Sequence, residues 1–168
     1  MSVSKRVLVT AGSKHGATAE IAARIAEVLT RRGISVVVAN PREVRSLEGL
    51  DAVVLGSAVY AGHWLSEAIE LAEKIAAADP KPPTWLFSSG PIGDPPRPEE
   101  DPVDVADVSA KTSATDHRVI SGKIDKAKLG FGERAITMAL RAPEGDFRDW
   151  VEIEAWADGI ANSVIEAA

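Results

Sequence analysis

Residues 7–29, with the sequence VLVTAGSKHGATAEIAARIAEVL, run from a short apolar segment through a loop of small and hydroxylic residues directly into a helix pattern. From residue 16 to residue 32 the apolar side chains recur at helical spacing. Gly33 stands where a C-terminal helix cap is expected. A strand that passes at once into a helix predicts the start of a β-α-β unit, in which the next strand lies parallel to the first.

Three further segments have the character of strands. Each is a nearly continuous apolar run bounded by turn residues, and they cover residues 34–39, 51–56 and 84–88. Strands buried on both faces of a parallel sheet have this pattern, whereas half-exposed strands alternate between apolar and polar residues. The three segments therefore predict the interior of a parallel sheet.

Helix patterns and one more strand alternate with these segments. We expect helices at residues 66–78, at 104–114 and from Trp150 onward, a fifth strand at 117–122, a long proline-rich loop at 90–102, and a short or missing helix between the second and third strands. This order predicts a single α/β domain over residues 1–168: a three-layer sandwich whose five-stranded parallel sheet has the order 2-1-3-4-5, with helices on both faces. In such a fold, ligands bind at the carboxyl ends of the strands.

The composition excludes several classes of protein. The chain of 168 residues has no cysteine, which rules out disulfides, thiolate metal sites and a cysteine nucleophile. A net charge of -6 argues against nucleic acid as a partner, because phosphate backbones are bound by clustered lysine and arginine. No apolar run approaches the roughly 20 residues that span a bilayer, and the N-terminus lacks the apolar core of a signal peptide. We therefore expect a cytoplasmic protein.

Three kinds of catalytic site do not fit the sequence. His15, His63 and His117 lack metal-binding spacing, and no G-x-S-x-G motif supplies a hydrolase nucleophile. The first and third strands end at Thr10 and at Ser57, where a response regulator of this strand order would need acidic residues. We therefore predict no metal site and name no catalytic side chain.

The loop at residues 10–18 is suited to an anion. Its backbone N–H groups converge on the N-terminus of the first helix, which carries about half a positive charge. Ser13 and Thr18 add hydroxyl groups, and Gly12 and Gly16 allow an anion to approach the backbone. The spacing is neither that of a P-loop nor that of the GxGxxG dinucleotide fingerprint. The sequence predicts a phosphate site here, with an ordinary helix cap on a turn as the alternative.

Two more loops are expected at the same edge of the sheet, at residues 56–65 and 88–94. A flat heteroaromatic ring fits between them, stacked on Tyr60 or Trp64 and hydrogen-bonded by main-chain groups. Tyr60 is the better candidate, because Trp64 has burial beneath the following helix as its alternative. Phosphate at one end and a ring at the other describe a mononucleotide. The predicted ring contacts are Ala58, Val59, Tyr60, Ala61, Gly62, Ser88, Ser89, Gly90 and Pro91.

The strand, the loop GSKHGAT, the loop GSAVYAGHW and the order of the elements resemble a flavodoxin. Flavodoxins bind FMN non-covalently and hold its phosphate with a loop of the form G-T-x-T-G-x-T. His15 departs from this pattern, because the family commonly has threonine there, and an imidazole would replace the lost hydroxyl. By this resemblance the phosphate contacts are Ser13, Lys14, His15, Gly16, Ala17 and Thr18.

Within the flavodoxin group, YAGHW and the segments RVISGKID, LGFGERAITMAL and DFRDW are similar to the menaquinone-dependent protoporphyrinogen dehydrogenases of bacteria. Those proteins carry an insertion near the fifth strand, which implies here a basic insert helix at about 123–147. Between residues 118 and 141 the chain has six basic residues against two acidic ones. This segment suits a peripheral membrane or quinone-side patch, with a helix that packs on the sheet and solvates its lysines as the alternative.

The expected function is FMN-dependent redox chemistry. In such proteins the cofactor supplies the chemistry, while the protein sets its geometry and potential. The first interpretation is an enzyme resembling protoporphyrinogen dehydrogenase, with a porphyrinogen as substrate, a quinone as acceptor and at most peripheral contact with the inner face of a membrane. The alternatives are a soluble flavodoxin-type electron carrier with a redox partner, and a flavin-free interaction module that keeps the fold.

Overall fold

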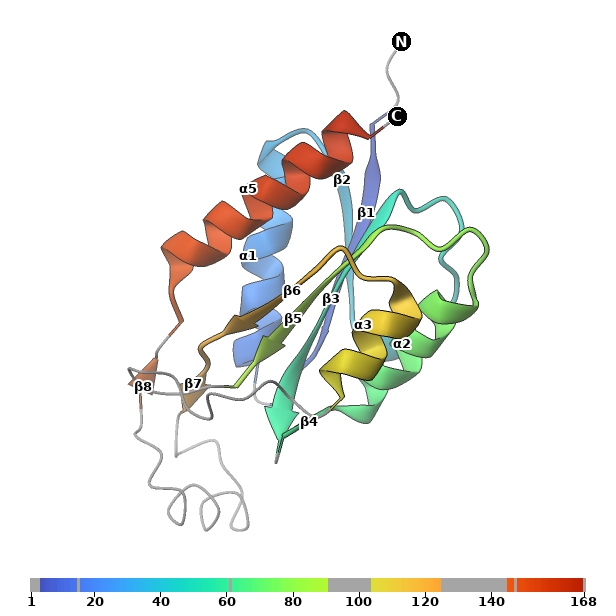
Figure 1. Ribbon diagram of the computed structural model, residues 1–168. Helices are drawn as coiled ribbons and strands as arrows, with labels where there is room; N and C mark the ends of the chain where they lie inside the picture. Colours follow the sequence, from blue (N-terminus) through green and yellow to red (C-terminus); the bar gives the residue numbers. More distant parts are fainter. Residues whose placement is uncertain are drawn as a thin grey trace.

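The three layers of the expected sandwich are visible in the computed structural model of the chain (Figure 1). The structure describes residues 4–14, 16–60, 62–90, 104–124, 145–146 and 148–167. Within these residues a twisted parallel sheet forms the middle layer, and helices cover both of its faces. The predicted α/β class is therefore confirmed.

The sheet has the strand order that the sequence predicts. Its parallel strands are β1 (Arg6–Gly12), β2 (Ser35–Ala39), β3 (Ala52–Tyr60), β5 (Thr84–Ser89) and β6 (Asp116–Ile120). They lie in the order β2-β1-β3-β5-β6, which is the order 2-1-3-4-5 when the parallel strands are counted along the chain. The short strand β4 (His63–Trp64) adds an antiparallel pairing to the end of β3.

Helices connect successive strands and divide between the two faces. On one face lie α1 (Ala17–Arg31) and α5 (Trp150–Glu166), and on the other lie α2 (Ser66–Ala77) and α3 (Val105–Thr112) (Figure 1). A short 3₁₀ helix, η1 (Pro41–Glu43), replaces a full helix between β2 and β3. Among the described residues, no helix is long and apolar enough to span a membrane.

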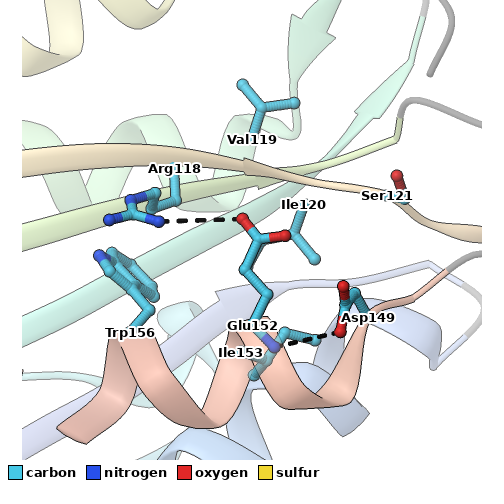
Figure 2. A pocket seen from close by; sticks show the side chains of 8 residues that line it. All are labelled: Arg118, Val119, Ile120, Ser121, Asp149, Glu152, Ile153 and Trp156. Carbon is cyan, nitrogen blue, oxygen red and sulfur yellow. Dashed lines mark hydrogen bonds and ion pairs between the residues drawn. The ribbon is translucent and has the colours of Figure 1, made fainter. Parts of the chain in front are cut away.

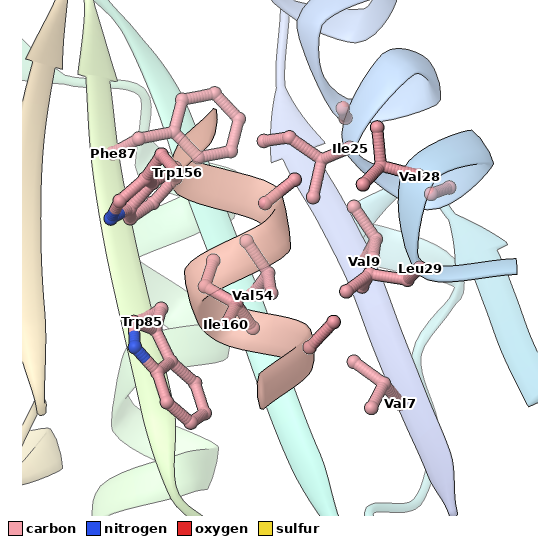
Figure 3. Packing of buried hydrophobic residues seen from close by; sticks show 14 of the residues in the cluster. Val7, Val9, Ile25, Val28, Leu29, Val54, Trp85, Phe87, Trp156 and Ile160 are labelled. Atoms are coloured by element: carbon pink, nitrogen blue, oxygen red, sulfur yellow. The ribbon is translucent and has the colours of Figure 1, made fainter. Parts of the chain in front are cut away.

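Each face of the sheet has its own apolar core. On the α1 and α5 face, Ile25 and Ile160 pack against the side chains of the central strands (Figure 3). Phe87 meets Trp156 edge to face there, with ring centroids 6.1 Å apart. The Phe87 ring lies directly over the backbone of Gly56, since a Cβ atom built on Gly56 would stand 2.1 Å from it. Any side chain at position 56 would therefore displace the largest fully buried residue of this core.

The structure corrects several expected boundaries. β1 runs to Gly12 and α1 begins at Ala17, so the first loop is shorter than 10–18, and Thr18 lies in the helix. The segment 56–65 is not an open loop, because β3 continues to Tyr60 and β4 folds back on it. The positive φ of 82° at Gly62 permits this tight turn, since glycine lacks the Cβ atom that disfavours it.

The expected insert helix at 123–147 is wrong at both ends. Residues 123–124 and 145–146 form the strands β7 (Lys123–Ile124) and β8 (Gly145–Asp146), which pair antiparallel. The interior of that prediction, residues 125–144, lies outside the described residues. The β7-β8 ribbon brings the two ends of this segment together beside the sheet (Figure 1).

Thr10 offers a test of the packing of β1. The residue is fully buried, and its hydroxyl group has no hydrogen-bond partner in the described part of the chain. We expect Thr10→Val to raise the free energy of unfolding by about 1 kcal/mol, because the substitution removes an unpaired buried hydroxyl and keeps the shape. Urea denaturation measures the change.

The matched control is Thr84→Val. Thr84 is equally buried, at the start of β5, but its hydroxyl donates to the carbonyl of Pro82 at 2.9 Å. This variant is expected to lose about 1 kcal/mol, since it removes a hydrogen bond that is formed. A Thr10→Val protein as destabilised as Thr84→Val would contradict the interpretation.

Candidate functional site

The loops predicted to bind a mononucleotide lie at one edge of the sheet. The carboxyl ends of β1, β3 and β5 point to this edge, and α1 begins there (Figure 1). Since parallel strands in this order leave a crevice where the connections diverge to opposite faces, the edge is the expected place for a ligand.

The start of α1 has donors available for an anion. Gly16 is its N-cap residue, with a φ of 90°, and no side chain caps the first turn. Ser13 Oγ instead accepts a hydrogen bond from the Gly16 N–H at 3.1 Å, which folds the loop back on itself. The first N–H groups of a helix have no partner within the helix, and the helix dipole makes this end positive. The loop therefore presents backbone donors rather than a closed cap.

Thr18 adds a hydroxyl group to this end of the helix. Its side chain is only 3% exposed, and no hydrogen bond of its hydroxyl is formed with the described residues. The hydroxyl is not among the fully buried unpaired atoms of the described residues, so solvent reaches it and a bound acceptor can reach it too. The donor set at this position, which consists of backbone amides and one hydroxyl, fits a phosphate group.

Lys14 and Tyr60 connect the first loop with the end of β3. Lys14 Nζ lies 5.2 Å from the centroid of the Tyr60 ring. Tyr60 is half-buried and Lys14 is exposed. A cation at this distance is attracted to the face of an aromatic ring. The expected phosphate contact and the expected stacking residue are therefore neighbours.

Trp64 is not a stacking residue. Its side chain is 5% exposed and belongs to the apolar cluster under α2, as the alternative interpretation required. Its indole Nε1–H donates to Ser88 Oγ at 2.8 Å, and Ser88 Oγ is 2.7 Å from His117 Nε2. The three side chains form a chain of hydrogen bonds from β4 across β5 to β6. Of the two aromatic candidates, Tyr60 alone remains.

A second polar contact fixes the hairpin that carries Tyr60. Asp104, just before α3, accepts a hydrogen bond from the Trp64 N–H at 3.0 Å, and its same oxygen is 3.2 Å from His63 Nδ1. Leu65 N–H donates to Ser57 Oγ at 2.9 Å. The turn after β3 is thus held from both sides.

The ends of β3 and β5 approach each other closely. A Cβ atom built on Gly90 would stand 3.0 Å from Val59 Cβ, a tighter contact than ordinary packing. Ser88 and Ser89 are buried within β5, so they are strand residues and not, as expected, part of a loop. Gly90 is the one described residue of this segment that follows the strand, and its N–H donates to the carbonyl of Ile120 at 3.4 Å.

The structure brings most of the predicted contacts to this edge. Ser13, Lys14, Gly16, Ala17 and Thr18 form the loop and the first turn of α1; Ala58, Val59 and Tyr60 end β3; Gly62 forms the turn; and Ser88, Ser89 and Gly90 end β5. His15, Ala61 and Pro91 lie outside the described residues. The assignment of these residues to a cofactor stays a prediction.

Sequence reasoning did not single out Arg148, which lies behind the first turn of α1. Its side chain is 4% exposed, and it donates to Asp146, to Glu20 and to the carbonyl of Ala17. The hydrogen bonds to Arg148 lower the pKa of Asp146, and those to Asp146 raise the pKa of Arg148. An arginine among acidic residues in DFRDW has the pattern of a solvated surface charge, so no local signal identifies its burial.

A separate cavity of about 240 Å³ lies between β6 and α5. Figure 2 shows Arg118 and Glu152 facing each other across it, 3.8 Å apart, and Asp149 capping the helix through the Glu152 N–H. Arg118 and Glu152 are therefore paired with each other, while Asp149 is occupied by the helix backbone. None of the predicted contact residues lines this cavity, so it is distinct from the candidate site.

Comparison with known proteins gives one family and several similar folds. The model of the flavodoxin domain family matches residues 8–149. No curated protein matches the chain. A flavodoxin from the domain Archaea is 16% identical, with a TM-score of 0.67, over 96% of this chain and 99% of that one. A flavodoxin from Streptococcus pneumoniae TIGR4 is 17% identical, with a TM-score of 0.64, over 94% and 99%.

A longer protein contains a similar domain. Rubredoxin oxygen:oxidoreductase from Desulfovibrio gigas is 14% identical to this chain, with a TM-score of 0.65. The match covers 96% of this chain but only 37% of that one. At these identities the likeness shows a shared fold.

The interaction of Asp146 with Arg148 predicts that the free energy of unfolding depends on pH. Arg148 lowers its pKa below the ordinary 3.8 in the folded state, so its contribution is present above pH 3.8 and is lost as the pH falls through the folded-state value. Asp146→Asn is therefore expected to be less stable than the parent at pH 7, with a difference that shrinks below pH 3.8. Thermal unfolding of the parent and the variant at pH 7 and at pH 3 measures this difference in stability.

The control is Asp158→Asn, which removes an exposed ion pair between α5 and Arg32 at the end of α1. Exposed pairs contribute at most about 1 kcal/mol, so little change is expected. An equal destabilisation by Asp146→Asn at pH 7 and at pH 3 would contradict the pKa argument.

Proposed function

This chain belongs to the flavodoxin domain family, and we propose that it binds FMN non-covalently and transfers electrons through it. Membership of the family supports FMN as the cofactor. The observation that carries the proposal is the uncapped start of α1, with the unpaired hydroxyl of Thr18 beside it, at the carboxyl edge of the sheet. This arrangement suits the phosphate of FMN.

Each part of the site has a role in this proposal. The backbone amides of the first turn of α1 and the Thr18 hydroxyl hold the phosphate, and Lys14 adds a nearby positive charge. Tyr60 packs against one face of the isoalloxazine ring, while main-chain groups after Ser89 bind its polar edge. The flavin, when bound, supplies the redox chemistry. The role of the protein is then to position the ring, and electron transfer through it needs no side chain as a general acid or base.

A second candidate function is the oxidation of a porphyrinogen with a quinone as acceptor, as in the menaquinone-dependent protoporphyrinogen dehydrogenases that the sequence resembles. The β7-β8 ribbon favours it, because the ribbon brings together the two ends of a long segment beside the predicted flavin site. In each cycle two electrons and two protons would pass from the porphyrinogen by way of the flavin to one quinone, which becomes a quinol, and three cycles would complete the oxidation to the porphyrin.

The colour of the purified protein separates the main alternatives. A flavin absorption spectrum, present on isolation or after incubation with FMN, is expected for both redox functions. A protein that stays colourless would instead favour a flavin-free interaction module. Anaerobic bleaching of the flavin by protoporphyrinogen, with recovery on addition of a menaquinone analogue, would identify the enzyme. Bleaching by a chemical reductant alone would indicate an electron carrier.

Thr18→Val tests the phosphate site directly. The substitution keeps the shape but removes a hydroxyl that donates to the phosphate, so FMN binding should weaken by roughly 1–3 kcal/mol. Fluorescence titration of FMN measures the change. Thr30→Val is the control, since Thr30 lies at the far end of the same helix and bonds the carbonyl of Ala26. Unchanged affinity in Thr18→Val would show that the phosphate binds elsewhere.

A further inference from the structure

Arg148 is a buried arginine with nearly all of its donors engaged. Its side chain is 4% exposed. On one edge of the guanidinium, Nε and Nη2 donate to the two oxygens of Asp146 at 2.8 and 2.7 Å. On the other edge, Nη1 donates to the Ala17 carbonyl at 3.2 Å and to Glu20 at 2.6 Å. The side chain thus joins β8 to the first turn of α1.

The surroundings of Arg148 hold it in place. Its guanidinium lies 4.6 Å from the centroid of the Trp150 ring, at the start of α5. Arg24, from the second turn of α1, lies 4.7 Å from the same ring and also pairs with Glu154 at 3.0 Å. A planar guanidinium with a bidentate carboxylate is rigid, because each hydrogen bond fixes the direction of the next. Arg148 is therefore a fixed support, whereas Arg24 does not reach the first turn.

We propose that Arg148 is a positioning residue, which holds the first turn of α1 so that its amides and the Thr18 hydroxyl bind the phosphate of FMN. This rests on the proposed function. Arg148 itself does not contact the phosphate, because its donors already face Asp146, Glu20 and Ala17. Arg148 therefore affects the binding of the phosphate of FMN and not the binding of the ring. Arg148 thereby determines the preference for FMN over riboflavin, which has the same ring and no phosphate.

Arg148→Lys separates positioning from charge. Lysine keeps the positive charge beside Glu20 and Asp146, but one ammonium group cannot form the carboxylate fork and reach the Ala17 carbonyl together. The ratio of FMN to riboflavin affinity is expected to fall about tenfold, since a small misplacement of binding groups has effects of this size or larger. Riboflavin affinity is expected to stay as in the parent. Fluorescence titration with each flavin measures both.

Arg24→Lys is the matched control. It replaces the other guanidinium on the Trp150 ring and leaves the first turn of α1 untouched. Its flavin ratio should equal that of the parent, even where its melting temperature falls as much as that of Arg148→Lys. An unchanged ratio in Arg148→Lys would overturn the proposal, and so would an equal fall in Arg24→Lys.

Amide hydrogen exchange tests the positioning role of Arg148 in the protein without flavin. In the absence of flavin, amides of the first turn of α1 should exchange faster in Arg148→Lys than in Arg24→Lys or the parent. Should the parent bind neither FMN nor riboflavin, the proposed function fails, and this exchange still decides whether Arg148 holds the turn. Equal exchange in all three proteins would overturn the positioning role.

Discussion

Burial of the central strands on both faces is the constraint from which the rest of the structure follows. β1, β3 and β5 send side chains into one apolar cluster beneath α1 and α5 and into a second beneath α2 and α3. Because neither face of these strands meets water, α1, α2 and α3 cover the faces as they connect parallel strands, and only the connection from β2 to β3 has the short η1 in place of a full helix. The carboxyl ends of the three strands then lie together, outside the core (Figure 1). At this edge of the sheet, backbone groups are available to bind a ligand.

The same constraint explains which parts of the fold the sequence predicts. Continuous apolar runs and helical spacing identified the central strands and the described helices, because these patterns reflect burial. The apolar run at 34–39 was wrongly expected in the interior of the sheet, since β2 lies at its edge and Val38 is 57% exposed. The strand order followed from the alternation of strands and helices. The end of β3 was missed, because AVYAGHW has the small residues of a loop. Its fold-back depends on the pairing of Val59 with Trp64, a contact that no local period encodes.

The candidate site was also predicted only in part from the sequence. The glycines and hydroxyl residues after β1 identify the start of α1, and the strand order places the other two segments beside it. The polar contacts that hold these segments could not be predicted, because they join distant positions: Ser88 lies 29 residues from His117, and Arg148 lies 131 residues from Ala17. Arg148 and Ser88 also belong to residue types that are most often solvated, so sequence alone gave no reason to bury them.

When the main chain binds the ligand, the side chains that matter are those that hold the backbone in place, and these need not contact the ligand. Backbone amides are present whatever the side chains are, so a loop such as residues 13–16 needs only the right conformation to bind an anion. In this site the supports of the backbone are Ser13, which accepts from the Gly16 N–H in the first loop; Arg148, which holds the first turn of α1; and Asp104, which holds the separate turn after β3. Substitutions at these supports change the position of the binding groups without removing any of them. Specificity at such a site is therefore determined as much by the residues that hold the backbone as by those that face the ligand.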